Sequence, residues 1–201
     1  EAVQITKKAI ANQQIPVALG DYSDRPGDAT WILSELIDEE VEKVLYAALR
    51  DEFALEALKE QNAQPGDLFS RKVGGITGEQ AGPAVQIDGE VLFFGPQWGY
   101  DHVAAIGFGN DNVLIITPTY EQIIQPESLR FGPINPDDFD VFVVKSRVHF
   151  RRGFDETGYA KTIQVVDAPG DWFGTIRINA LEYEFGPIDQ LYPFNTETID
   201  Y

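Results

Sequence analysis

Residues 141–154 read VFVVKSRVHFRRGF, and this stretch indicates the architecture of the chain. Its four leading apolar residues, Val141–Val144, are typical of a strand buried on both faces, as in a parallel sheet covered by helices. Lys145 and Ser146 follow, where such a strand would leave the core, and a histidine and three arginines come next. The stretch therefore predicts a buried strand that ends in a cluster of cations.

Strand and helix patterns alternate on both sides of this stretch. Further strands are predicted over residues 16–19, 43–49, 113–116 and 163–166. Helices are predicted over residues 1–14, from Asp28 to about 37, over 52–61, near 120–124 and from about 150. Alternation of this kind favours parallel pairing, with helices covering the faces of the sheet.

The pattern changes between Asp67 and about Phe108, where glycines separate short strand-like runs. The run VQIDGEVLFF is interpreted as a hairpin that turns at Asp88-Gly89. The sequence therefore predicts an α/β fold, with a largely parallel sheet, flanking helices and a β-rich antiparallel insertion at about residues 67–108. Because no repeat or low-complexity linker interrupts the chain, residues 1–201 are expected to form a single domain.

Composition excludes several classes of function. The 33 acidic residues against 15 basic ones give a net charge of -18, which disfavours nucleic acid and anionic membranes as partners. No apolar run has the length of a membrane span, and the chain has no cysteine for disulfides or thiolate metal sites. A cytoplasmic location is expected. The chain begins at Glu1 and contains no methionine, which predicts a piece of a longer protein.

Polar side chains follow several of the predicted strands, at the edge where ligands bind in open α/β sheets. Asp21, Asp24 and Asp28 follow the first strand, and Lys145, Ser146, His149 and Arg151 follow residues 141–144. Because a charge at a buried strand end must be paired or hydrated, Lys145 and Arg151 are expected to turn toward Asp21 and Asp24. Arg152 is expected to face solvent.

Less specific interpretations of these residues stay open. Asp28 has the residue type and position of a helix N-cap. A nucleophilic pair of Ser146 and Lys145, as in an independent serine hydrolase, is disfavoured because successive strand residues point to opposite faces. His102 and His149 fit no metal-binding spacing, so no metal ligand and no catalytic residue is assigned in this chain, and zinc binding by the chain alone should be weak.

Four segments in this order resemble the C-terminal domain of the microcystin-degradation (MlrC-like) metallopeptidase family. They are DYSDRPGDAT, a glycine pair followed by AGPAVQIDGEV, VVKSRVHFRRGF and VVDAPG. The resemblance extends from about Pro16 to Pro193. One departure is the loop SDRPGD, which lacks the longer glycine run of the family.

The resemblance implies a zinc-dependent peptidase or amidohydrolase whose zinc ligands and acid/base groups lie in an N-terminal catalytic domain of the same polypeptide. This chain would be its accessory domain, closing the active-site cleft over a small peptide-like substrate. The expected substrate-binding residues are Lys145, Ser146, His149, Arg151, Asp21, Asp24 and Asp28. The alternative is a non-catalytic module that binds a small anion or forms a homo-oligomer.

Overall fold

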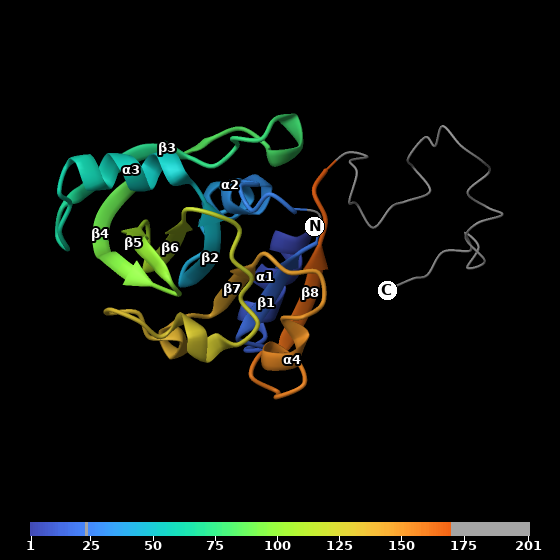
Figure 1. The fold of residues 1–201 in the computed structure, drawn as a ribbon. Helices are drawn as coiled ribbons and strands as arrows, with labels where there is room; N and C mark the ends of the chain where they lie inside the picture. The colour runs from blue at the N-terminus through green and yellow to red at the C-terminus, as the bar shows by residue number, and fades with distance from the viewer. Residues whose placement is uncertain (23, 170–201) are drawn as a thin grey trace.

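The computed structural model describes residues 1–22 and 24–169, in which eight strands form one sheet in the order β3-β4-β5-β6-β2-β7-β1-β8 (Figure 1). The strands are β1 (Val17–Asp21), β2 (Val44–Arg50), β3 (Leu68–Val73), β4 (Val85–Gln97), β5 (Tyr100–Phe108), β6 (Asn112–Thr117), β7 (Val141–Val144) and β8 (Thr162–Val166). The α-helices are α1 (Ala2–Ala11), α2 (Trp31–Asp38), α3 (Glu52–Glu60) and α4 (Arg151–Phe154).

The five strands predicted from apolar runs form the parallel part of the sheet. Strand β7 pairs in parallel with both β1 and β2, β2 pairs with β6, and β1 pairs with β8. Residues Val141–Val144 have no exposed surface, as expected for a strand with neighbours on both sides and packing on both faces. The α/β fold and the buried strand are therefore confirmed.

Strands β3, β4 and β5 form the antiparallel part and continue the same sheet beyond β6. The predicted hairpin at Asp88-Gly89 is wrong, because β4 runs through both residues without a turn. A Cβ atom at Gly89 would overlap the carbonyl oxygen of Gly107, so this glycine permits close approach of β5. The chain reverses instead at Trp98-Gly99, where both residues have positive φ, 53° and 84°.

The helix predicted near residues 120–124 is not formed. The chain there is irregular and leads into a short 3₁₀ helix, η2 (Pro126–Leu129). Pro126 disfavours helical backbone at the residue before it, and the Tyr120 hydroxyl donates a hydrogen bond to the carbonyl oxygen of Lys145, 2.6 Å away. A tertiary contact therefore holds this segment across the end of β7.

Two apolar layers cover the two faces of the sheet. Helices α1, α2 and α3 pack on one face, and α4 together with the segment that follows β6 packs on the other (Figure 1). No helix within the described residues is long and apolar enough to cross a membrane. Loops follow the carboxyl ends of the parallel strands, and these loops carry the predicted site residues.

Packing at the end of β1 gives a testable prediction. A Cβ atom at Gly20 would overlap the Phe150 ring and lie 3.0 Å from the Ser146 carbonyl oxygen. Gly20→Ala is therefore expected to lower the free energy of unfolding by about 1–3 kcal/mol through overpacking, measured by urea denaturation. Gly95→Ala is the matched strand control, since its Cβ atom would lie 3.4 Å from the nearest atom, in the Phe93 ring. Equal losses in the two variants would contradict the packing argument.

Candidate site at the carboxyl edge of the sheet

Lys145 lies at the centre of a buried polar network at the carboxyl end of β7. Its ammonium nitrogen is 2.9 Å from Asp21 Oδ2 and 2.6 Å from Asp24 Oδ2. It also donates to the carbonyl oxygen of Ala29 at 2.7 Å and to the Tyr46 hydroxyl at 2.8 Å. The predicted pairing of Lys145 with Asp21 and Asp24 is therefore confirmed. The Lys145 side chain has no exposed surface.

The sequence places these groups together through the register of three neighbouring strands. Asp21 ends β1 and Lys145 follows β7, which pairs with β1 on one side and with β2, the strand of Tyr46, on the other. Asp24 lies in the loop after β1 and also accepts hydrogen bonds from the backbone N–H groups of Gly27 and Ala29, at 2.8 and 2.9 Å. The network therefore ties residues 24–29 to the end of β7.

Two carboxylates share one ammonium in this network, and the titration of the groups reflects it. Burial raises the pKa of the Asp21 carboxyl, and the Lys145 charge only partly offsets that effect. Burial alone would lower the pKa of Lys145, but Asp21 and Asp24 outweigh burial and raise it well above its ordinary value. These contacts therefore favour the charged form of Lys145 within the network.

Asp28 ties the antiparallel part of the fold to the same edge. Its Oδ2 atom accepts from the backbone N–H groups of Ile76 and Thr77 at 2.6 and 2.7 Å, and its Oδ1 atom accepts from the Thr77 hydroxyl at 2.9 Å. The interpretation of Asp28 as a helix N-cap is therefore wrong. Helix α2 begins later, at Trp31, with Thr30 at its N-cap position.

Three further residues support this edge, and sequence reasoning assigned them no role. Asp51 accepts from the backbone N–H of Ala54, as the N-cap of α3, and from that of Gly74, both at 2.9 Å. Tyr46 and Tyr120 contribute their hydroxyl groups to the Lys145 network and to the Lys145 carbonyl oxygen. An Asp directly before a helical pattern was a usable signal for Asp51, whereas the role of each tyrosine depends on tertiary contacts.

The remaining predicted site residues divide between buried and exposed positions. Ser146 is buried, and its hydroxyl oxygen accepts from Gln122 Nε2 at 2.9 Å. His149 is exposed, with Nδ1 3.4 Å from Gln122 Oε1. The expectation that Arg151 turns toward Asp21 and Asp24 is wrong, because Arg151 pairs at 2.9 Å with Asp155, one helical turn away. Arg152 is exposed, as expected.

Two arginines, in loops that carry residues of the buried network, each lie over a tyrosine ring. Arg147 lies over the Tyr22 ring at 4.7 Å and donates through Nε to the Tyr22 carbonyl oxygen at 3.2 Å. Arg25 lies over the Tyr120 ring at 5.5 Å. Val148, 56% exposed, and His149 adjoin Arg147 in the chain. We call the surface formed by Tyr22, Arg25, Tyr120, Arg147, Val148 and His149 the cationic rim.

The donor groups at the carboxyl edge do not fit a zinc ion. Asp21 and Asp24 already share the Lys145 ammonium, and Asp28 accepts three hydrogen bonds from residues 76 and 77. Across residues 1–22 and 24–169, no three His, Cys, Asp or Glu side chains are grouped so that they could hold a metal. A zinc-dependent step therefore cannot be assigned to the described residues.

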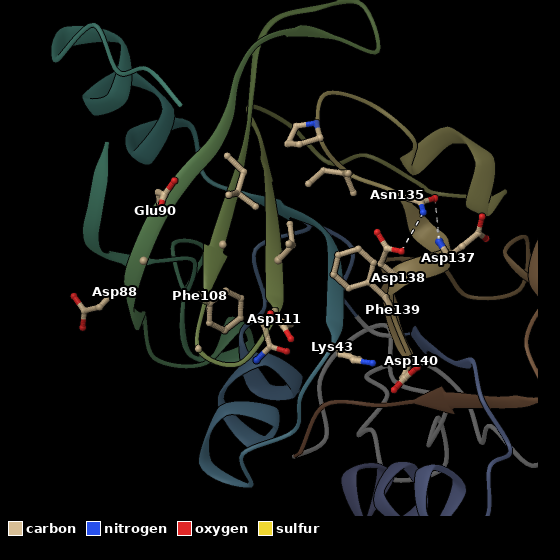
Figure 2. Close-up of a pocket in the computed structure, with 18 of the residues that line it drawn as sticks. Lys43, Asp88, Glu90, Phe108, Asp111, Asn135, Asp137, Asp138, Phe139 and Asp140 are labelled. Carbon is tan, nitrogen blue, oxygen red and sulfur yellow. Dashed lines mark hydrogen bonds between the residues drawn. The ribbon is translucent and has the colours of Figure 1, made fainter. Parts of the chain in front are cut away.

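A concave surface of about 1070 Å³ lies at the opposite edge, where β2, β6 and β7 begin (Figure 2). Six carboxylates and Lys43 line it, and the carboxylates are those of Asp88, Glu90, Asp111, Asp137, Asp138 and Asp140. Several have partners of their own, since Asp138 accepts from Asn135 and Asp137 pairs with Arg130. None of the predicted site residues lies in this groove.

Comparison with known proteins identifies a family and a similar solved structure. Residues 25–176 match the family described as MlrC C-terminus. The chain is also similar to a crystal structure from Mesorhizobium sp. BNC1 described as a "Putative metallopeptidase", with a TM-score of 0.63 and 14% sequence identity. The match covers 92% of this chain and 42% of that one, so this chain spans less than half of its structural relative. No curated protein matches the chain significantly.

Proposed function

The chain belongs to the MlrC C-terminal domain family, and on that premise we propose that it is the accessory C-terminal domain of a zinc-dependent peptidase or amidohydrolase. In this proposal the zinc ligands and the acid/base groups belong to an N-terminal catalytic domain of the same polypeptide, located in the cytoplasm. The relative described as a metallopeptidase supports the assignment, because this chain aligns with less than half of it.

The observation that carries the proposal is the construction of the carboxyl edge of the sheet. Lys145, Asp21 and Asp24 join two loops through buried contacts of 2.6–2.9 Å. Asp28 adds a third loop, over residues 74–77. Catalytic sites require groups that are held rigidly before substrate binds. Loops fixed in this way are suited to forming one wall of an active-site cleft over a small peptide-like substrate.

The roles proposed for individual residues follow from burial. Lys145, Ser146, Asp21, Asp24 and Asp28 are buried, so they position the loops. Arg25 and His149 are exposed, and Arg147 is partly exposed. The alternative of a module that binds a small anion without a catalytic partner is favoured by the cationic rim. The two functions differ in whether the longer protein contains a catalytic domain that binds zinc.

The test compares this chain with a gene product that carries it together with an N-terminal catalytic domain. The longer protein is expected to contain zinc and to hydrolyse some peptides of a test panel. Chromatography of the products measures this hydrolysis. This chain alone is expected to show no hydrolysis and no defined zinc stoichiometry after dialysis and elemental analysis. A tight one-to-one complex of zinc with this chain would contradict the proposal that the zinc ligands belong to the N-terminal domain. A longer protein without zinc or hydrolysis would support the anion-binding alternative.

A further inference from the structure

The concave surface of about 1070 Å³ at the amino ends of β2, β6 and β7 has a large excess of negative charge. Three separate parts of the chain supply its six carboxylates, namely β4 with Asp88 and Glu90, the turn between β5 and β6 with Asp111, and the segment before β7 with Asp137, Asp138 and Asp140. Among the described residues that line it, Lys43 is the only cation. We call this surface the acidic groove.

Apolar side chains form the floor of the acidic groove. Val113, Ile134 and Phe139 line it and are buried, and Leu92 and Phe108 line it and are half-buried. Figure 2 shows carboxylates of β4 on one side of Phe108 and carboxylates of the segment before β7 on the other. The groove is therefore a hollow with apolar surface at its centre and negative charge at its sides, unlike an exposed run of acidic residues.

Half of the carboxylates in the acidic groove are not engaged by the protein. Within residues 1–22 and 24–169, the side chains of Glu90, Asp111 and Asp140 form no hydrogen bond or ion pair, and Lys43 forms no ion pair. The same residues include no group of acidic and histidine side chains that could hold a metal ion. Like charges around a concave surface reinforce one another's field. The charge of the groove is therefore available to a cationic ligand other than a metal.

Lysine and arginine side chains match both features of the acidic groove. Each has an apolar stem, which packs along apolar surface, and a charged end, which reaches outward to a carboxylate. Because the carboxylates come from three separate parts of the chain, several cations on one segment can be paired at the same time, and linked contacts of this kind reinforce one another. A second copy of this chain is a poor occupant, since its net charge of -18 opposes association with a negative surface.

We propose that the acidic groove is a docking surface for a partner protein, and that it binds a segment with several Lys or Arg residues and at least one apolar residue. The partner's cationic ends pair with the carboxylates at the sides, and its apolar side chain packs on the floor. None of the predicted substrate-binding residues lines this groove. The inference therefore does not rest on the proposed function and adds a separate binding surface.

The test is a titration of the 201-residue chain with an acetylated and amidated heptapeptide that contains four Lys or Arg residues and one Leu, followed by ¹H–¹⁵N spectra. Saturable shifts are expected at the amides of residues 88–90, 107–113 and 134–140. The same peptide with Gln at each cationic position should cause none. The combined variant Glu90→Gln, Asp111→Asn and Asp140→Asn should bind the cationic peptide about 10-fold more weakly, as expected for the loss of three solvent-accessible ion pairs.

A second combined variant controls for attraction to the overall negative charge. Asp38→Asn, Glu60→Gln and Asp101→Asn change three exposed carboxylates outside the groove and alter the net charge by the same amount. This variant should bind the peptide almost as well as the unmodified chain at physiological salt, because ions screen distant charges. Circular dichroism and urea denaturation establish that both combined variants are folded.

The contribution of the apolar floor is tested on the side of the ligand, which leaves the protein unchanged. The same cationic peptide with Ser in place of its Leu should bind several-fold more weakly, because less apolar surface is removed from water. Equal affinity of the two peptides would show that the floor takes no part in binding and would overturn the proposed mode of docking.

Four further results would overturn the proposal. They are equal losses of affinity in the two combined variants, equal binding of the peptide with Gln, binding of n-butylammonium as tight as that of the cationic peptide, and self-association of the chain that the groove variant abolishes. The last result would assign the groove to a second copy of the chain. The titration requires no hydrolysis, so a failure of the proposed function would leave its outcome unchanged.

Discussion

Lys145→Met is expected to lower the free energy of unfolding by about 3–5 kcal/mol, because it leaves buried carboxylates without their counter-charge. Methionine has a similar length and is apolar, so the change removes the charge while conserving most of the volume. Asp21 and Asp24 are 4% and 5% exposed, and water cannot replace the ammonium without opening the loop. Urea denaturation near neutral pH gives the measurement, and Arg152→Met, which changes an exposed cation, should have little effect.

The same variant should show a distinctive pH dependence. Burial already raises the pKa of Asp21 in the folded state, and without the Lys145 charge this pKa should rise further above the unfolded value of about 3.9. A group with a raised folded pKa stabilises the protein below its unfolded pKa, and this contribution is lost as pH rises through the folded pKa. The deficit of Lys145→Met should therefore be small at about pH 4 and complete near neutral pH. A deficit that does not depend on pH would assign the loss to packing alone.

Alkaline conditions should act on the unmodified protein through the same cluster. The pKa of Lys145 is raised well above its ordinary value in the folded state. Its stabilising contribution is therefore complete below the unfolded pKa of about 10.4 and declines as pH rises through the folded value. The Lys145→Met variant lacks this titration, so the two proteins should become more similar in stability at strongly alkaline pH.

Asp28→Ala is expected to lower the free energy of unfolding by about 2–4 kcal/mol, since it removes the acceptor of two backbone N–H groups and a hydroxyl group. The Ile76 and Thr77 amides lie 2.6 and 2.7 Å from its Oδ2 atom and would lose that partner. Faster hydrogen exchange at these two amides should accompany the change. The effect is expected to be largest over residues 74–84, the loop that joins β3 to β4.

A carboxylate on the surface provides the control for Asp28. Asp88 accepts hydrogen bonds from Ser70 and Gln86, at 2.6 and 2.9 Å, but its side chain is exposed. Asp88→Ala should change stability little, because water replaces the lost partner. If Asp28→Ala and Asp88→Ala have equal effects, or if the exchange of the Ile76 and Thr77 amides is unchanged, the buried contact does not organise this loop.

Much of the fold is determined by apolar periodicity. The runs over residues 43–49, 113–116 and 141–144 lie in neighbouring parallel strands, because runs of this type can be buried only when both faces of a sheet are covered. The β-rich character of residues 67–108 also follows from local composition. The hairpin at Asp88-Gly89 was wrong because turn-like residues are also used where two strands approach closely, and local sequence does not distinguish the two uses.

The candidate site was also predictable only in part from the sequence. The sequence predicted that Asp21, Asp24 and Lys145 gather at one edge, because alternating strands and helices favour parallel strands, whose carboxyl ends lie at the same edge of a sheet. Only the tertiary structure decided that Lys145 is buried among these carboxylates, whereas Arg151 pairs with Asp155 on its own helix. The free energy of a charge depends on how much water its complete surroundings exclude, and those surroundings come from segments distant in the chain. A nearby residue supplies the partner of a surface arginine, but a buried lysine acquires its partners only when the sheet and its loops are assembled.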